Sequence, residues 1–177
     1  MKRTASQPEE YDLVVLGSGA AGKLLSWTLA KARMKTAVVE RKYVGGSCPN
    51  IACLPSKNVI HSAKVVSYFR RGEEFGINSN SKTNMAAVIE RKRKMVAGLV
   101  DVHLDLYQKS GAELIMGSGR FVAPKTIEVK SADDGIRLLH GKHVVINTGT
   151  HATIDAARAA ASFGSSRLGA SAMTAGS

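Results

Sequence analysis

A glycine-rich segment near the N-terminus constrains the fold more than any other feature of this chain. Residues 17–22 read Gly-Ser-Gly-Ala-Ala-Gly and match the pattern G-x-G-x-x-G. The apolar run 12–16 before them is typical of a strand buried in a parallel sheet, and the apolar positions of 20–35 recur at helical spacing. A second apolar run, 36–40, ends in Glu40, eighteen residues after the last glycine. The order strand, helix, strand predicts an α/β fold built on parallel strands.

Each part of this segment has a physical role in binding a dinucleotide. Gly17 allows a tight turn, Gly19 lets the backbone approach a pyrophosphate, and Gly22 lets helix and strand pack closely. The helix N-terminus presents free N–H groups to the anion. Glu40 is placed to accept hydrogen bonds from ribose hydroxyls. The alternative is that three glycines merely punctuate a loop; the complete order of elements favours a Rossmann-like dinucleotide-binding domain.

The rest of the chain predicts two further helices and a strand-rich segment. The sequence looks helical from about Ser56 to Tyr68, and apolar residues recur at steps of three and four from Asn84 to Gln108. Beyond residue 111, short apolar runs are separated by Gly, Pro and Asp-Asp-Gly segments. These runs begin at Leu114, Arg120, Thr126, Ile136 and His143. The expected fold is α/β, with a parallel sheet and a small antiparallel β-meander.

The 177 residues have room for about one domain. We expect a flexible N-terminus over 1–10, the nucleotide-binding domain over 11–154 and a tail over 155–177. Nine Ala, five Ser and three Gly lie among the last 27 residues, so the tail is expected to be disordered apart from a weak helix over 155–163. The start of the chain is charged, and no stretch approaches the ~20 apolar residues of a membrane span, which indicates a cytoplasmic protein.

The formal net charge of +11 leaves a basic nucleic-acid-binding domain as one alternative. The longest basic run, Arg91 to Lys94, has no interleaved aromatic residues, and only 5% of the chain is aromatic. Platforms on which bases stack are therefore scarce. The run falls near the solvated side of the helix predicted over 84–108, so nucleic acid is not expected as a partner.

The two cysteines of the chain, Cys48 and Cys53, lie five residues apart. On a regular helix this spacing puts their Cα atoms about 8.6 Å apart, beyond the ~6.8 Å limit of a disulfide. A bonded pair would need a distorted turn, which Pro49 favours through its fixed φ and missing N–H. Two unrelated buried cysteines are the alternative.

No metal site is expected. Two thiols need two further ligands to hold zinc, and the chain has no second cysteine pair. The other histidines considered are expected to be core or surface residues rather than ligands: His61, His103, His140 and His143.

Around the cysteines the chain resembles a known family. Residues 45–57 read Gly-Gly-Ser-Cys-Pro-Asn-Ile-Ala-Cys-Leu-Pro-Ser-Lys and follow the glycine motif and Glu40. This arrangement closely resembles the pyridine nucleotide-disulfide oxidoreductases, such as mercuric reductase, dihydrolipoyl dehydrogenase and glutathione reductase. The likeness continues through 117–121 and through 144–149, where the family has an apolar strand ending in Ala-Thr-Gly. It covers residues 11 to about 154.

The resemblance implies FAD as the cofactor. It places the first glycine loop at the pyrophosphate, Glu40 at the adenosine ribose, Lys57 beside the flavin ring and Gly119 near adenine. The residues that it assigns to the cofactor are Gly17, Ser18, Gly19, Gly22, Glu40, Gly46, Ser47, Lys57, Gly119 and Thr148.

The resemblance also implies roles for the cysteines. Cys53 is the charge-transfer thiol nearer the flavin, and Cys48 is the interchange thiol that meets the substrate. In such enzymes a hydride passes from NAD(P)H to the flavin, whose electrons reduce the Cys48–Cys53 disulfide and then a disulfide or metal-ion acceptor of unknown identity. A nearby helix N-terminus and Lys57 are expected to lower a cysteine pKa.

The chain departs from the family in several places. Family members are longer and add an NAD(P)H domain, a returning segment that completes the flavin site, and a dimerisation domain; no NAD(P)H site is assigned here. Asn147 replaces the usual alanine. The segment after 154 lacks the expected proline, which suggests a frameshift or truncation near residue 155. We therefore expect only the FAD and disulfide half of such an enzyme, with a non-catalytic FAD-binding fragment as the alternative.

Overall fold

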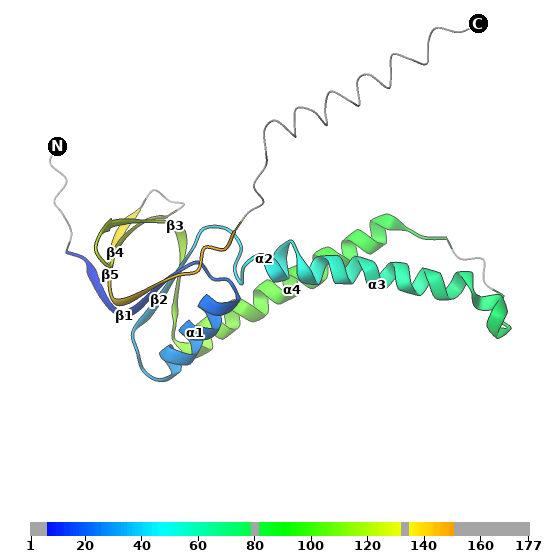
Figure 1. The fold of residues 1–177 in the computed structure, drawn as a ribbon, viewed down its shortest axis with the longest axis horizontal. Coiled ribbons are helices and arrows are strands. Elements are labelled where there is room, and N and C mark those ends of the chain that lie inside the picture. The colour runs from blue at the N-terminus through cyan, green and yellow to red at the C-terminus, as the bar shows by residue number, and fades with distance from the viewer. Residues whose placement is uncertain (1–6, 79–81, 132–134, 151–177) are drawn as a thin grey trace, which may run out of the picture.

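The residues that the structure describes form a five-stranded barrel, a helix packed against it and a long arm of two helices (Figure 1). The structure, a computed structural model, describes residues 7–78, 82–131 and 135–150. The predictions of a flexible N-terminal end, a disordered tail and a weak helix over 155–163 fall largely or wholly outside the described residues.

The first three elements form the predicted strand, helix, strand unit. They are β1 (Glu9–Leu16), α1 (Ala20–Lys31) and β2 (Thr36–Glu40), and β1 pairs with β2 in parallel. Helix α1 ends earlier than the predicted residue 35 because Arg33 adopts a left-handed φ of 66°, a conformation that a helix cannot continue through.

Strands β3 (Glu113–Ala123) and β5 (Ile136–Ile146) each pair in parallel with one neighbour and antiparallel with β4 (Thr126–Ser131), which lies between them. The first part of β3 runs parallel to β2 and its second part pairs antiparallel with β4. Strand β5 begins antiparallel to β4 and continues parallel to β1. This confirms the predicted parallel sheet with a small antiparallel meander.

Two apolar layers cover the two faces of the parallel strands. Val14 and Val39 face the inside of the barrel, where they join a cluster with residues of β4 and β5. Val15 and Val38, their neighbours in sequence, face the helices and join a cluster with Tyr107. The alternation follows from the two-residue period of a strand, and both faces are apolar because both are buried.

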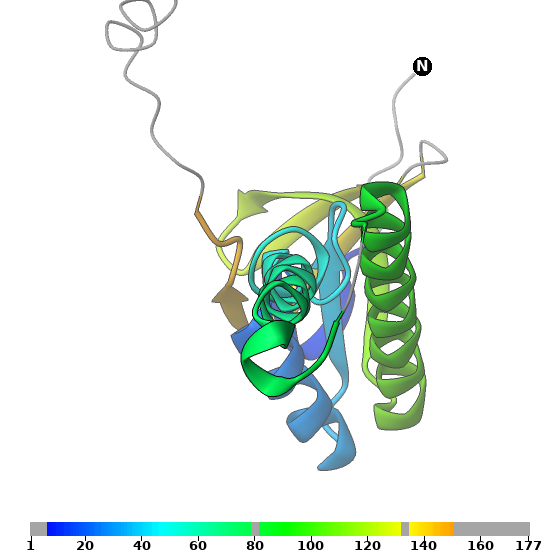
Figure 2. The ribbon, with the colours of Figure 1, turned by 90° about the vertical axis from the view of Figure 1, so that its right-hand side faces the viewer.

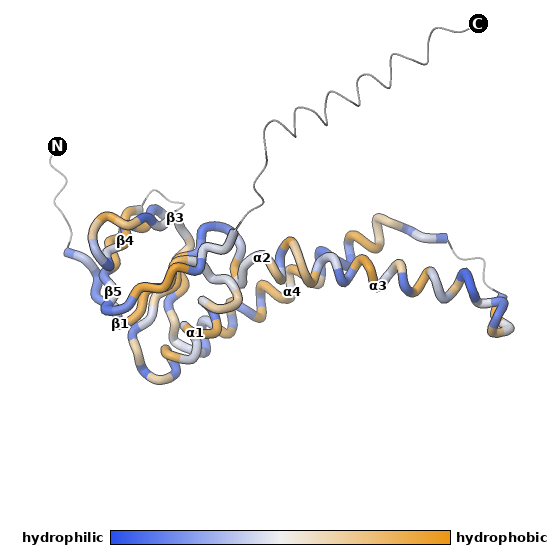
Figure 3. Tube along the Cα trace, viewed as in Figure 1, coloured by the Kyte–Doolittle hydropathy of each residue, from blue (hydrophilic) through white to orange (hydrophobic). Residues whose placement is uncertain are grey.

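The arm consists of α3 (Cys53–Arg70) and α4 (Met85–Ser110), which pack against each other and extend away from the barrel (Figure 1). Figure 2 shows α3 nearly end-on, with α4 beside it. A short helix, α2 (Ser47–Asn50), precedes the arm. A 3-10 turn, η1 (Gly72–Phe75), lies between α3 and α4 in sequence. Both long helices were predicted, and α3 begins three residues earlier than expected. Apolar segments recur along the whole arm, between polar ones (Figure 3).

The basic run on α4 is partly engaged with α3. The Arg91 guanidinium donates to the Asn58 carbonyl at 2.5 Å and to the Ser62 hydroxyl at 2.7 Å.

Within the described ranges, no helix is both long enough and apolar enough to pass through a bilayer.

Candidate functional site

A cleft of about 650 Å³ opens where β1, β2 and β5 end. Such crevices at the carboxyl ends of parallel strands are where open α/β folds bind ligands. Most of the residues assigned from the sequence line it: Gly17, Gly19, Glu40, Gly46, Ser47, Cys48, Gly119 and Thr148. Ser18 and Gly22 are buried, and Cys53 and Lys57 lie on the first turns of α3.

The glycine loop is packed backbone to backbone. A Cβ on Gly22 would collide with the Gly17 carbonyl oxygen and lie 2.6 Å from the Asn147 amide nitrogen. Gly46 has a φ of 83°, and a Cβ on it would lie 2.7 Å from the Gly19 Cα. Because Gly46 immediately precedes α2, this close approach brings the cysteine-bearing segment against the N-terminus of α1.

Hydrogen bonds between Ser18 and Glu40 hold the glycine loop together. The Ser18 hydroxyl and backbone N–H donate to one Glu40 carboxylate oxygen at 2.7 and 2.9 Å. The backbone N–H groups of Lys42 and Tyr43 donate to the other oxygen at 2.8 and 3.0 Å. Burial raises the pKa of Glu40, but these hydrogen bonds outweigh it, so the pKa lies below its usual range. Glu40 is thus an ionised organiser of the loop as well as part of the cleft wall.

Asn147 fastens the end of β5 to the same loop. Its side-chain amide donates to the Gly17 carbonyl at 3.1 Å, and its backbone N–H donates to the Leu16 carbonyl at 2.8 Å. Asn147 was noted in the sequence only as a departure from alanine. The larger side chain is accommodated beside the small Gly19 and Gly22.

The cysteine segment is a distorted turn, as a close cysteine pair requires. Helix α2 stops at Asn50, and α3 begins only at Cys53, after Ala52 with φ −115° and ψ −99°. The Asn50 amide donates to the Val44 and Gly46 carbonyls at 2.9 and 2.8 Å, which fixes this segment. No sequence motif could have revealed this role of Asn50.

The two cysteines are free thiols that contact one another. Cys48 is half-buried and Cys53 is exposed. A side-chain hydrogen bond with Cys53 raises the pKa of Cys48, and the nearby charges of Lys23 and Lys57 lower it by a smaller amount. The expectation of a lowered pKa is therefore wrong for Cys48 in this state, because its hydrogen bond with Cys53 favours the protonated form, and a negative charge on Cys53 would disfavour a second one on Cys48.

Lys23 and His103 form a polar cluster that the sequence did not reveal. The Lys23 ammonium lies 2.5 Å from His103 Nε2 and 3.5 Å from the Gly45 carbonyl. His103, expected to be a core or surface residue, is indeed buried, with 8% of its surface exposed. The two residues are 80 positions apart in sequence, so no local spacing links them.

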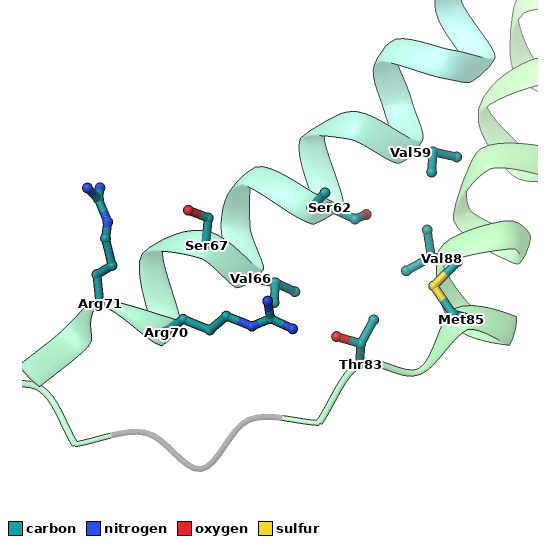
Figure 4. A pocket seen from close by; sticks show the side chains of 10 residues that line it. Val59, Ser62, Val66, Ser67, Arg70, Arg71, Thr83, Met85 and Val88 are labelled. Carbon is teal, nitrogen blue, oxygen red and sulfur yellow. The ribbon is translucent and has the colours of Figure 1, made fainter.

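A second hollow, of about 480 Å³, lies between α3 and α4 far from the glycine loop. Figure 4 shows Val59, Val66 and Val88 pointing into it, with the Arg70 guanidinium between Val66 and Thr83. Its walls are largely apolar and hold no cysteine, histidine or carboxylate. Among the described residues, no group of three or more His, Cys, Asp or Glu side chains is placed to hold a metal ion.

The cleft at the glycine loop fits an adenine dinucleotide. Its volume lies within the usual range for cofactor sites, ~300–1,000 Å³. Helix α1 begins after Gly19 with no side-chain cap, so its first-turn N–H groups are left for an anion. Gly119, which lines the cleft, lets β3 pack closely on β1, since a Cβ there would lie 2.6 Å from the Leu16 side chain.

Comparison with known proteins agrees with this geometry. Residues 11–165 match the family described as pyridine nucleotide-disulphide oxidoreductase. The chain is 34% identical over 142 residues to a dihydrolipoyl dehydrogenase of Mycoplasma pneumoniae, a match that covers 79% of this chain and 30% of that protein. It is 33% identical over 142 residues to a soluble pyridine nucleotide transhydrogenase of Pseudomonas fluorescens, covering 79% and 31% of the two chains.

A solved structure is also similar. The HOCl-induced flavoprotein disulfide reductase RclA from Escherichia coli, as its Cu(II) complex, superposes with a TM-score of 0.70 at 28% identity. The match covers 84% of this chain and 30% of that one, so the present chain spans about a third of the length of its relatives. From the family match, the cleft and the paired cysteines together, the chain belongs to the pyridine nucleotide-disulphide oxidoreductases.

Proposed function

We propose that this chain is the FAD-binding, disulfide-bearing part of a flavoprotein disulfide reductase. In this proposal residues 11–154 form the FAD-binding part. Electrons from NAD(P)H pass through FAD to a disulfide between Cys48 and Cys53, and from there to a disulfide or metal-ion acceptor. The nicotinamide site and any dimerisation surface are assigned to no residue of this chain.

One observation carries the proposal. A single cleft is lined by Glu40, the glycine loop and Cys48, and Cys48 contacts Cys53. A dinucleotide with its diphosphate at the α1 N-terminus and its ribose at Glu40 would thus share one cleft with the Cys48 thiol. Ser47, Thr148 and Gly119 line the remaining walls.

The four hydrogen bonds that Glu40 already accepts bear on its proposed ribose contact. A carboxylate offers about four acceptor positions, and Ser18, Lys42 and Tyr43 use them here. A ribose hydroxyl would therefore share or replace one of these bonds. Glu40 would then affect cofactor binding in two ways, by holding the glycine loop and by contacting the ribose directly.

Bound FAD would supply two-electron transfer between a nicotinamide and the cysteine pair. Reduction of the pair breaks its S–S bond, using two electrons, and leaves two sulfurs that carry protons according to their pKa. The half-buried Cys48 thiolate attacks an acceptor disulfide and forms a mixed disulfide, releasing one acceptor thiolate. Attack by Cys53 on Cys48 releases the second and restores the Cys48–Cys53 bond.

The test starts from the purified 177-residue chain, titrated with FAD while flavin absorbance and fluorescence are recorded. We expect one FAD per chain. Anaerobic titration with dithionite should consume two more electron equivalents per FAD in the oxidised wild-type protein than in a Cys53→Ser control, which keeps the cleft but lacks the disulfide. Protein that takes up no FAD would overturn the proposal.

Reduction by NADH or NADPH separates two outcomes. Bleaching of the bound flavin by either nucleotide supports a catalytic role for this chain. Flavin that binds but bleaches only with dithionite identifies a non-catalytic FAD-binding fragment, and overturns electron entry from NAD(P)H in this chain.

A further inference from the structure

The Lys23 ammonium is held in one place by groups from three segments. It projects from α1, lies 2.5 Å from His103 Nε2 on α4 and reaches the Gly45 carbonyl at 3.5 Å. His103 Nδ1 lies 2.5 Å from the Leu99 carbonyl oxygen, so Nδ1 carries the proton and donates. Nε2 is then the acceptor, and the lysine keeps its proton and positive charge.

The packing around this pair is tight. The His103 ring is buried, with 8% of its surface exposed, and a Cβ on Gly45 would lie 3.1 Å from it. The Trp27 ring lies with its centroid 5.8 Å from that of His103 and 6.0 Å from the Lys23 nitrogen. A lysine ordinarily moves freely in solvent; this one is fixed between a histidine, an indole and a backbone carbonyl.

The fixed charge contacts the loop that carries Cys48, through the Gly45 carbonyl. Gly45 and Cys48 belong to the same loop and line the same cleft. The positive charge of Lys23 lowers the pKa of Cys48. Burial lowers the pKa of Lys23, and the charge of Cys48 raises it by a smaller amount. The other groups that act on Cys48 are Cys53 and the exposed Lys57, both on α3.

We propose that Lys23, fixed by His103 and Gly45, is a positioning residue that stabilises the thiolate form of Cys48 and so sets its reactivity. Lys23 exchanges no proton in this role: the proton of Cys48 goes to solvent, and the ammonium remains charged. The use of this thiolate in disulfide exchange rests on the proposed function, whereas the effect on Cys48 itself does not.

A buried charge differs from an exposed one in its response to salt. Lys57 is exposed, so its effect on Cys48 is screened by added salt. Lys23 is partly buried and hydrogen-bonded, and its effect persists. The cluster thus gives the thiol a charge partner that ionic strength does not remove.

The experiment measures the rate of iodoacetamide alkylation of Cys48 against pH by mass spectrometry. It uses the full chain with Cys53→Ser, so that Cys48 is the one thiol and neither disulfide formation nor FAD binding is needed. Lys23→Gln removes the charge but keeps an N–H donor for His103 and Gly45. Lys23→Arg keeps the charge, and Lys31→Gln is a matched control at the exposed end of the same helix.

We expect Lys23→Gln to raise the pKa of Cys48 by at least about half a unit, which lowers alkylation at neutral pH about threefold. Lys23→Arg should recover most of the rate, and Lys31→Gln should leave it unchanged. The Lys23→Gln difference should survive a change from low salt to about 0.5 M salt.

A Lys23→Gln profile that coincides with that of Lys31→Gln would overturn the proposal. If Lys23→Gln does not fold by circular dichroism, His103→Phe decides instead: it keeps the lysine but removes its acceptor, and the pKa of Cys48 should again rise. An unchanged profile in His103→Phe contradicts the positioning role. Either result is independent of whether the chain binds FAD.

Discussion

At the scale of single residues, the missing side chain of Gly22 sets the distance between α1 and the end of β5. A Cβ at this position would meet the Gly17 carbonyl and the Asn147 amide at once. Neither group can move freely, because the Asn147 amide is hydrogen-bonded to that same carbonyl. The packing of helix on sheet and the shape of the phosphate loop therefore depend on one another.

Gly22→Ala should destabilise the fold and weaken FAD binding together. The added methyl group overpacks a site with no slack, and we expect a loss of about 1–3 kcal/mol in the free energy of unfolding, measured by urea denaturation. Gly98→Ala is the matched control, because Gly98 lies within α4 with open space around it. That change should stabilise the protein by about 0.5–1 kcal/mol. Equal behaviour of the two variants would contradict the close packing at Gly22.

The sequence predicted the residues of the cleft that follow one another along the chain. The glycine loop, Glu40 and the cysteine turn are local patterns, and each lies at the cleft or against it. Contacts between distant positions were missed. Lys23 with His103 and Asn147 with Gly17 are separated by 80 and 130 positions. The direction of the Cys48 pKa was also wrong, since it depends on contact with the Cys53 thiol.

At the scale of elements, helix α4 begins and ends as its sequence indicates. Asn84 caps it, its side-chain oxygen accepting the Ala87 N–H at 3.1 Å, and Gly111 ends it with a φ of 79°. Strands were harder to delimit. Gly117 and Gly119 looked like breaks but lie inside β3, and Gly141 lies inside β5; neighbouring chain approaches all three closely. The five expected runs are therefore three strands.

Asn84→Ala should loosen the exposed start of α4. Loss of the cap costs about 1 kcal/mol, which multiplies the open population of the first turns about fivefold. Trypsin should therefore cleave the basic run 91–94 about fivefold faster, measured by gel or mass spectrometry under conditions where opening is rapid. Asn84→Ser, which can still accept the N–H, should be cleaved at close to the wild-type rate. Unchanged cleavage in the alanine variant would show that this cap does not govern opening.

At the scale of the whole molecule, an ionic network joins three strands that are far apart in sequence. Arg137 on β5 donates to both carboxylate oxygens of Glu9 on β1, at 2.6 and 2.8 Å, and to Glu113 on β3 at 2.8 Å. The Tyr11 hydroxyl donates to Glu113 at 2.5 Å. Burial is the main cause that raises the pKa of Tyr11 above its ordinary value. The network ties β1, β3 and β5 together at one end of the barrel.

Arg137→Met should destabilise the protein by about 1 kcal/mol at neutral pH, the partial exposure of the side chains limiting the effect. Hydrogen bonding to Arg137 lowers the pKa of Glu9. For Glu113, burial raises the pKa, but Arg137 and Tyr11 outweigh it. Carboxylates with lowered pKa stabilise the fold above their ordinary pKa of 4.5 and lose this contribution as pH falls below it.

The difference between wild type and Arg137→Met in urea denaturation should therefore shrink as pH falls below about 4.5. Arg120→Met provides the control. Arg120 pairs with Glu128 at 2.8 Å across two neighbouring strands, but its side chain is 71% exposed. Its replacement should change stability little at any pH. A difference for Arg137→Met that stays constant with pH would exclude ionisation of the two carboxylates as its cause.

Helix α4 is one continuous rod with two different surroundings. Its last turns bury His103, Tyr107 and Ser110 against the barrel, while its first turns expose Met85 and Ile89 along the arm. Amide protons near Met85 should exchange with solvent deuterium through local fraying, whereas those near Tyr107 should exchange only when the barrel itself opens. Lys23 and Cys48 lie near the barrel end of α4, where Lys23 contacts His103. Fraying of the helix near Met85 should therefore leave their geometry unchanged.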